Sequence, residues 1–104
     1  MKVQTEYVVA QFNISKKEVI SNERLNARLD NFATDFNDCY KEKYSMEAFL
    51  SIDFAKKNST LLMLIENEYP ADKIFDIFDE VICQEKYADL RNRLSCCFEH
   101  KCNC

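Results

Sequence analysis

Residues 48–66, AFLSIDFAKKNSTLLMLIE, decide the fold, because they can be interpreted either as two strands or as a helix. Apolar and polar residues alternate over 50–54 (LSIDF), which is typical of a half-buried strand. The polar segment 56–59 (KKNS) is typical of a turn. Residues 61–65 are apolar at every position, as expected of a central strand. We interpret the segment as a β-hairpin; the alternative is a helix, since Leu and Met also favour helices.

The residues before this hairpin predict a strand and then a long helix. Within 2–14, Val8, Ala10, Phe12 and Ile14 fall at every second position and would share one face of a strand, leaving Tyr7 and Val9 on the other. The sequence Ser-Lys-Lys-Glu at 15–18 is typical of a helix N-terminal capping box. The expected helix spans 16–42, because apolar residues recur there at spacings of three and four: Leu25, Leu29, Phe32, Phe36 and Tyr40.

After the hairpin, Pro70 can open a second helix, expected over 71–95. The order is then β-α-β-β-α. A right-handed crossover makes the first two strands parallel and leaves the apolar third strand between them, antiparallel to both. We therefore predict a small α+β domain over 1–95, a three-stranded sheet with two helices on one face, followed by a tail at 96–104. The rival is an all-α bundle, which applies if 48–66 is helical.

Composition excludes several kinds of active site. The chain has 104 residues, no glycine and a single histidine, His100. Phosphate-binding loops and the nucleophile elbow both require glycine, so neither is present. Without glycine, we expect the nine Asn and eight Asp residues to occupy the turn positions that require positive φ. We expect a protein that is not an enzyme and needs no cofactor.

Charge and hydropathy exclude two classes of binding partner, nucleic acids and membranes. Lys+Arg number 14 against 18 Asp+Glu, a net charge of −4, and the lysine pairs 16–17 and 56–57 are short and separated. Nucleic-acid binding requires clustered cations, so we expect none. No stretch is long and apolar enough for a signal peptide or a membrane span, so we expect no membrane contact and a cytoplasmic location. In that reducing compartment the six cysteines are expected to be thiols.

The most charged segment is 66–80, with six carboxylates against one lysine. On a helix, four of them would form one stripe, which is either a solvated face or a docking surface for a basic protein. Phe75 could anchor such a partner. The candidate partner-binding residues are Glu66, Glu68, Asp72, Phe75, Asp76, Asp79 and Glu80.

The tail gathers four cysteines and the histidine within 96–104. Zinc prefers four N or S ligands, so a second hypothesis is a small metal-binding module. Its ligands would be Cys97, His100, Cys102 and Cys104, with Cys83 as a substitute. The alternatives are a mobile reduced tail, a disulfide or redox role, or the prenylation signal that a terminal Cys-x-Cys resembles.

We interpret the chain as a non-enzymatic protein-binding inhibitor. Small acidic domains are common among immunity proteins, antitoxins and phage-encoded inhibitors of bacterial defence, whose targets are often basic nucleases. A negative stripe complements such a target by covering its nucleic-acid groove. A third hypothesis is a homodimeric scaffold subunit that uses the open face of the sheet.

Overall fold

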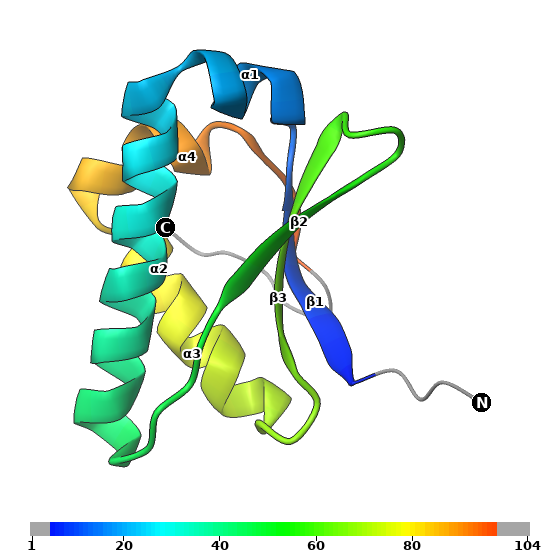
Figure 1. The fold of residues 1–104 in the computed structure, drawn as a ribbon. Helices are drawn as coiled ribbons and strands as arrows, with labels where there is room; N and C mark the ends of the chain where they lie inside the picture. Colours follow the sequence, from blue (N-terminus) through cyan, green and yellow to red (C-terminus); the bar gives the residue numbers. More distant parts are fainter. Residues whose placement is uncertain (1–4, 98–104) are drawn as a thin grey trace.

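The computed structural model describes residues 5–97, with side chains to residue 95. The fold is α+β, as predicted, but the sheet has four strands instead of three (Figure 1). In chain order the elements are β1 (Glu6–Phe12), α1 (Lys16–Ser21), α2 (Glu23–Tyr44), β2 (Ser51–Ala55), β3 (Thr60–Glu66), α3 (Ala71–Ile82), the 3-10 turn η1 (Glu85–Tyr87), α4 (Ala88–Arg91) and β4 (Leu94–Cys97).

The hairpin interpretation of 48–66 is confirmed, and the all-α alternative is wrong. The strand order is β2-β3-β1-β4, and every neighbouring pair is antiparallel. The apolar strand β3 therefore lies between β1 and β2, as predicted. Its register pairs Phe54 with Leu61 and Ser51 with Leu64. Because side chains alternate across a sheet, this register places Leu61, Met63 and Ile65 on the buried face.

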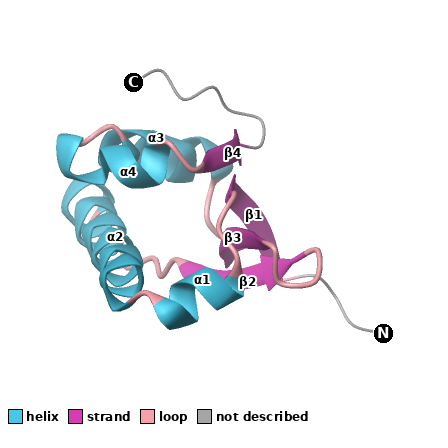
Figure 2. Ribbon diagram, turned by 90° about the horizontal axis from the view of Figure 1, so that it is seen from above, coloured by secondary structure: helices cyan, strands magenta, loops and turns pink. Residues whose placement is uncertain are grey.

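The helices lie on one side of the sheet, which closes the core (Figure 1, Figure 2). The apolar stripe predicted for the first long helix is confirmed, and the second long helix also buries one face. The buried residues are Leu25, Leu29, Phe32, Phe36 and Tyr40 of α2, and Ile74, Phe75, Ile77, Phe78, Val81 and Ile82 of α3. On the opposite face of the sheet, Leu62 and Leu64 are half-buried, and no helix of the described chain covers them.

The first strand departs from the predicted alternation. Its register with β3 shifts between Val8 and Ala10, which marks a β-bulge. Val9 and Ala10 are both fully buried, so the expectation that Val9 lies on the outer face is wrong. Tyr7 is only half-buried, and its hydroxyl donates to the carbonyl of Tyr69 at 3.0 Å.

The helix predicted over 16–42 is two helices that meet at Asn22. This residue has φ −130° and ψ 95°, which ends α1, and its side chain accepts from the Leu25 N–H at 3.1 Å, which caps α2. Ser15 caps α1 as predicted, accepting from the Glu18 N–H at 3.1 Å. The Glu18 carboxylate interacts with the Ser15 backbone N–H, as the predicted capping box requires, and it also binds Arg93. The side-chain cap at Asn22 therefore divides the predicted helix just before its apolar stripe begins at Leu25.

The helix predicted over 71–95 ends at Ile82, and the chain then returns to the sheet. Arg91 donates to the carbonyl of Ile82 at 2.8 Å, which satisfies a free acceptor at the end of α3. Beyond η1 and α4, the fourth strand pairs Leu94 with Phe12 on β1. This strand was not predicted, and it extends to Cys97, inside the segment expected to be a tail.

Candidate functional site

The predicted acidic stripe lies on α3, but its members have different environments. Asp72, Asp76 and Glu80 are exposed, and Asp79 is half-buried. Phe75, proposed as an aromatic anchor, is 6% exposed and belongs to the core, so that role is wrong. Its position at the margin of the apolar face suggested exposure, but the packing of α3 on the sheet and on α2 covers it.

Two of the stripe carboxylates contact α2. Asp76 accepts from Lys43 Nζ at 2.6 Å and from the Tyr44 hydroxyl at 3.2 Å. Glu80 accepts from Cys39 Sγ at 3.0 Å. Burial and this hydrogen bond raise the pKa of the Cys39 thiol to about 12. These carboxylates therefore serve contacts between helices and carry less free charge than the sequence indicates.

The remaining carboxylates gather where β3 turns into α3. Glu66 lies opposite Glu6 in the sheet, and its pKa is raised above its ordinary value because its protonated carboxyl group donates a hydrogen bond to Glu68 and because the Glu68 charge lies nearby. Within residues 5–97, Glu66, Glu68 and Asp72 form no ion pair. We call Glu6, Glu66, Glu68 and Asp72 the acidic end.

Two tyrosines hold this end of the molecule. The Tyr7 hydroxyl donates to the Tyr69 carbonyl, and the Tyr69 hydroxyl donates to the Glu47 carbonyl at 2.7 Å. The β3–α3 turn is thereby fixed to β1 and to the loop between α2 and β2. Burial raises the pKa of Tyr7 to about 12, so its hydroxyl remains a donor at neutral pH. Like charges are thus held together on a supported turn.

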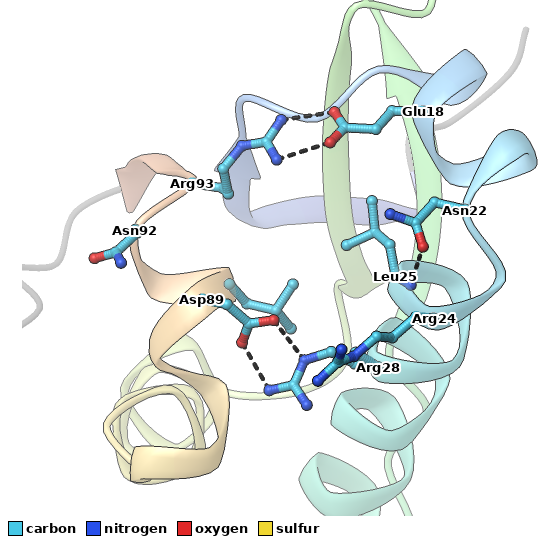
Figure 3. Close-up of a pocket in the computed structure, with 9 residues that line it drawn as sticks. Glu18, Asn22, Arg24, Leu25, Arg28, Asp89, Asn92 and Arg93 are labelled. Atoms are coloured by element: carbon cyan, nitrogen blue, oxygen red, sulfur yellow. Dashed lines mark hydrogen bonds and ion pairs between the residues drawn. The ribbon is translucent and has the colours of Figure 1, made fainter.

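A cleft of about 360 Å³ lies between α1, the start of α2 and α4 (Figure 3). Two ion pairs cross it: Arg93 holds Glu18 at 2.6 Å, and Arg28 holds Asp89 at 2.6 Å. Both carboxylates are therefore bound to guanidinium groups. The two ion pairs join α1 and α2 to the segment of α4 and Arg93, which is distant in sequence. Its lining residues are Glu18, Asn22, Arg24, Leu25, Arg28, Asp89, Leu90, Asn92 and Arg93.

Sequence reasoning did not find this cleft. The arginines and carboxylates that meet there are 61 and 75 residues apart in the chain. Residue spacing along a helix predicts contacts between side chains three or four positions apart. It does not predict ion pairs between segments that are distant in sequence.

The zinc hypothesis concerns residues that the structure does not describe. The described part of the chain does not include three of the proposed ligands, His100, Cys102 and Cys104, or the side chain of the fourth, Cys97. Within that part, no group of three or more His, Cys, Asp or Glu side chains could hold a metal ion. Cys39 is a free thiol, whereas Cys83 is disulfide-bonded and therefore offers no thiolate to a metal. The expectation of thiols throughout fails at Cys83, because it came from the inferred compartment and not from cysteine positions.

Comparisons with known proteins give no family for the chain. No family model, curated protein or solved structure matches it. Among the described residues, no helix has the length and apolar character needed to cross a membrane. The surfaces of this fold are therefore the basis on which a function can be proposed.

Proposed function

We propose that the chain is a non-enzymatic protein-binding inhibitor whose acidic end covers a basic surface of a target protein. The observation that carries the proposal is the contact between Glu66 and Glu68, which raises the pKa of Glu66. Holding like charges together disfavours the folded state. A cationic partner would relieve that repulsion, so the free energy of binding would include the relief of the repulsion between Glu66 and Glu68 in the unbound protein.

The docking surface proposed here differs from the whole helix stripe. Asp76 already has Lys43 as its partner, and Glu80 already accepts from Cys39. Displacing these contacts would cost part of any gain from a new ion pair. We therefore assign the docking role to Glu66, Glu68 and Asp72, with Glu6 beside them, and a minor role to Asp76, Asp79 and Glu80.

The target class we propose is a nuclease or another nucleic-acid-binding effector. Such proteins carry a positive groove for phosphates, and a cluster of fixed carboxylates complements it. By analogy of charge and size, we propose that the chain is an immunity protein, an antitoxin or an anti-defence inhibitor. The inhibitor would act by occupying the groove, without chemistry of its own.

A capture experiment with matched variants tests the proposal. The immobilised chain is incubated with host lysate at low and high salt, and bound proteins are identified by mass spectrometry. The variant Glu66→Gln/Glu68→Gln/Asp72→Asn should lose the basic proteins that the parent chain retains at low salt. The control Asp76→Asn/Glu80→Gln should retain most of them.

The captured protein then gives the decisive assay. Purified chain should inhibit its nuclease or nucleic-acid-binding activity at stoichiometric amounts, and the triple variant should not. Equal capture by the parent chain and the triple variant, or capture without inhibition, would overturn the proposal.

The cytoplasmic location is part of the same proposal and has its own test. A disulfide at Cys83 bears against it, because such bonds are rare in a reducing compartment. Alkylation of the chain in intact host cells, followed by peptide mapping, decides the matter. A free thiol at Cys83 supports the cytoplasm, and a retained disulfide places the chain in an oxidising compartment.

A further inference from the structure

The described cations that have no internal partner are concentrated at one place. Five lysines and arginines of residues 5–97 form ion pairs, Lys73 lies over the Tyr44 ring, and Arg91 donates to carbonyl groups. The described cations without such contacts are Arg24 and four lysines. Those lysines, which we call the basic end, are Lys16, Lys17, Lys56 and Lys57.

The fold brings the two lysine pairs together although 38 residues separate Lys17 from Lys56. The Lys16 N–H donates to the carbonyl of Asn58 at 2.8 Å, which joins the start of α1 to the tip of the β2–β3 hairpin. A hollow of about 510 Å³ lies between them, with no carboxylate in its lining: Ser15, Lys16, Lys17, Ile20, Lys57, Asn58 and Ser59. Ile20 is 73% exposed at its margin.

The acidic end lies at the other end of the sheet. The β2–β3 hairpin tip and α1 are at one end, whereas the β3–α3 turn and the α2–β2 loop are at the opposite end (Figure 1). That loop carries Met46 and Phe49, which are 54% and 63% exposed. Within the described chain, Ile20, Met46 and Phe49 are the exposed large hydrophobic side chains, so each charged end also has an apolar contact surface.

We propose that copies of the chain associate head to tail, with the basic end of one copy on the acidic end of the next. The opposite charges would attract and orient the copies, and Phe49 of one copy would enter the hollow beside Ile20 of the other. Two like ends repel, so the contact is heterologous and does not close into a symmetric dimer. The proposal shares the acidic end with the proposed function, and self-association would compete there with the target.

Complementary charge-neutralising variants test this arrangement. The basic-end variant is Lys16→Gln/Lys17→Gln/Lys57→Gln, and the acidic-end variant is Glu66→Gln/Glu68→Gln/Asp72→Asn. Each retains one functional end, so each alone should sediment as a monomer. Mixed together, they should form a 1:1 dimer and nothing larger, because the two neutralised ends no longer attract each other. Sedimentation velocity in low salt with a reductant measures this without intermolecular disulfides.

The wild-type chain should show a mean mass that rises with concentration and falls towards the monomer in high salt. The control Asp30→Lys/Asp38→Lys, at exposed positions of α2, should associate like the wild type. Ile20→Ser and Phe49→Ser remove no buried contact, and each should weaken association by roughly tenfold or more. They provide the readout if a triple variant does not fold.

Two results would overturn the proposal: a wild type that stays monomeric at all concentrations in low salt, or mixed variants that do not dimerise while each is folded by circular dichroism. Failure here is separable from failure of the proposed function. The basic-end variant should lose self-association but still capture the target, whereas the acidic-end variant should lose both.

Discussion

Glu18 and Arg93 are 75 residues apart in the chain and form a two-pronged ion pair, with Nη1–Oε2 at 2.8 Å and Nη2–Oε1 at 2.6 Å. Arg93 also donates from Nε and Nη2 to the carbonyl of Asn13 at 3.1 and 2.7 Å. One guanidinium group therefore fixes the first turn of α1, the end of β1 and the segment before β4. A planar group with five donors can do this, and a lysine cannot.

We predict that Glu18→Gln lowers the free energy of unfolding by about 0.5–1 kcal/mol at pH 7, since both side chains are partly exposed. The hydrogen bond from Arg93 lowers the pKa of Glu18 below its ordinary 4.5. A lowered carboxyl pKa stabilises the fold above pH 4.5, and that contribution is lost as the pH falls through the folded-state value. Urea unfolding at pH 7 and pH 3, followed by circular dichroism, should show a larger difference at pH 7 than at pH 3.

The control for this prediction is Glu23→Gln. Glu23 stands in the first turn of α2 as Glu18 does in α1, so both variants lose a favourable interaction with a helix N-terminus. Glu23 has no arginine partner in the described chain. Equal losses in the two variants, or a Glu18→Gln loss as large at pH 3 as at pH 7, would contradict the assigned role of Arg93.

The sequence predicted the hairpin and the strand order because both depend on local patterns. Strict alternation over 50–54 and an uninterrupted apolar run over 61–65 each match one strand type, and chain handedness then orders the strands. The break at Cys83 was missed because apolar residues continue beyond it, at Leu90 and Leu94. The break at Asn22 was missed because the predicted helix was extended back from Leu25 to the cap at Ser15. Only the backbone dihedrals and caps reveal where each helix stops.

The candidate site was predicted less well, for a different physical reason. The sequence places Asp76 and Glu80 on one helix face, but their charge is set by Lys43 and Cys39, 33 and 41 residues away. Such partners depend on how α2 packs on α3, and no sequence spacing encodes that packing. Glu66 and Glu68 were identifiable because their contact is local.

The absence of glycine has a measurable cost at the hairpin tip. Among residues 5–97, four have positive φ: Ser45 at 56°, which caps α2, and three in the hairpin turn, Lys56 at 52°, Lys57 at 56° and Asn58 at 66°. We expected Asn and Asp to take such positions, and only Asn58 fits. The others strain a Cβ atom against the backbone. Lys57→Gly should therefore raise the free energy of unfolding by about 0.5–1 kcal/mol, as measured by urea denaturation.

The comparison for the hairpin variant is Lys17→Gly, in the regular helix α1. There glycine only increases the freedom of the unfolded chain, so the free energy of unfolding should fall by about 1 kcal/mol. Opposite signs for the same substitution show that the backbone conformation, not the lost lysine charge, determines the result. A destabilising Lys57→Gly would contradict the assignment of backbone strain to this position.

Asn22 ends α1 with its backbone N–H, which donates to the Val19 carbonyl, and starts α2 with its side chain. Asn22→Ala removes the acceptor for the Leu25 N–H and should lower the free energy of unfolding by about 1 kcal/mol. Asn22→Asp should restore most of that loss, because aspartate caps equally well. Asn26→Ala, at an exposed interior position of α2, should be neutral or stabilising. Thermal unfolding of the four proteins checks the order, and a loss at Asn26 as large as at Asn22 would contradict it.

Cys39 should be an unreactive thiol despite its partial exposure. Burial, the hydrogen bond to Glu80 and the nearby Glu80 charge raise its pKa to about 12, so almost no thiolate exists at pH 8. Glu80→Gln keeps an acceptor for Sγ but removes that charge, so the pKa should fall. Alkylation should then accelerate roughly tenfold for each pKa unit recovered.

Peptide mapping after timed alkylation at pH 8 follows the Cys39 peptide apart from the other cysteines. In the wild type, the rate should keep rising through pH 10 without a plateau, since the thiol titrates only near pH 12. Asp38→Asn changes the carboxylate next to Cys39 in sequence, whose side chain makes no contact with the thiol, and should leave the rate nearly unchanged. A Glu80→Gln rate equal to that of the wild type would show that the contact between α2 and α3 does not control this thiol.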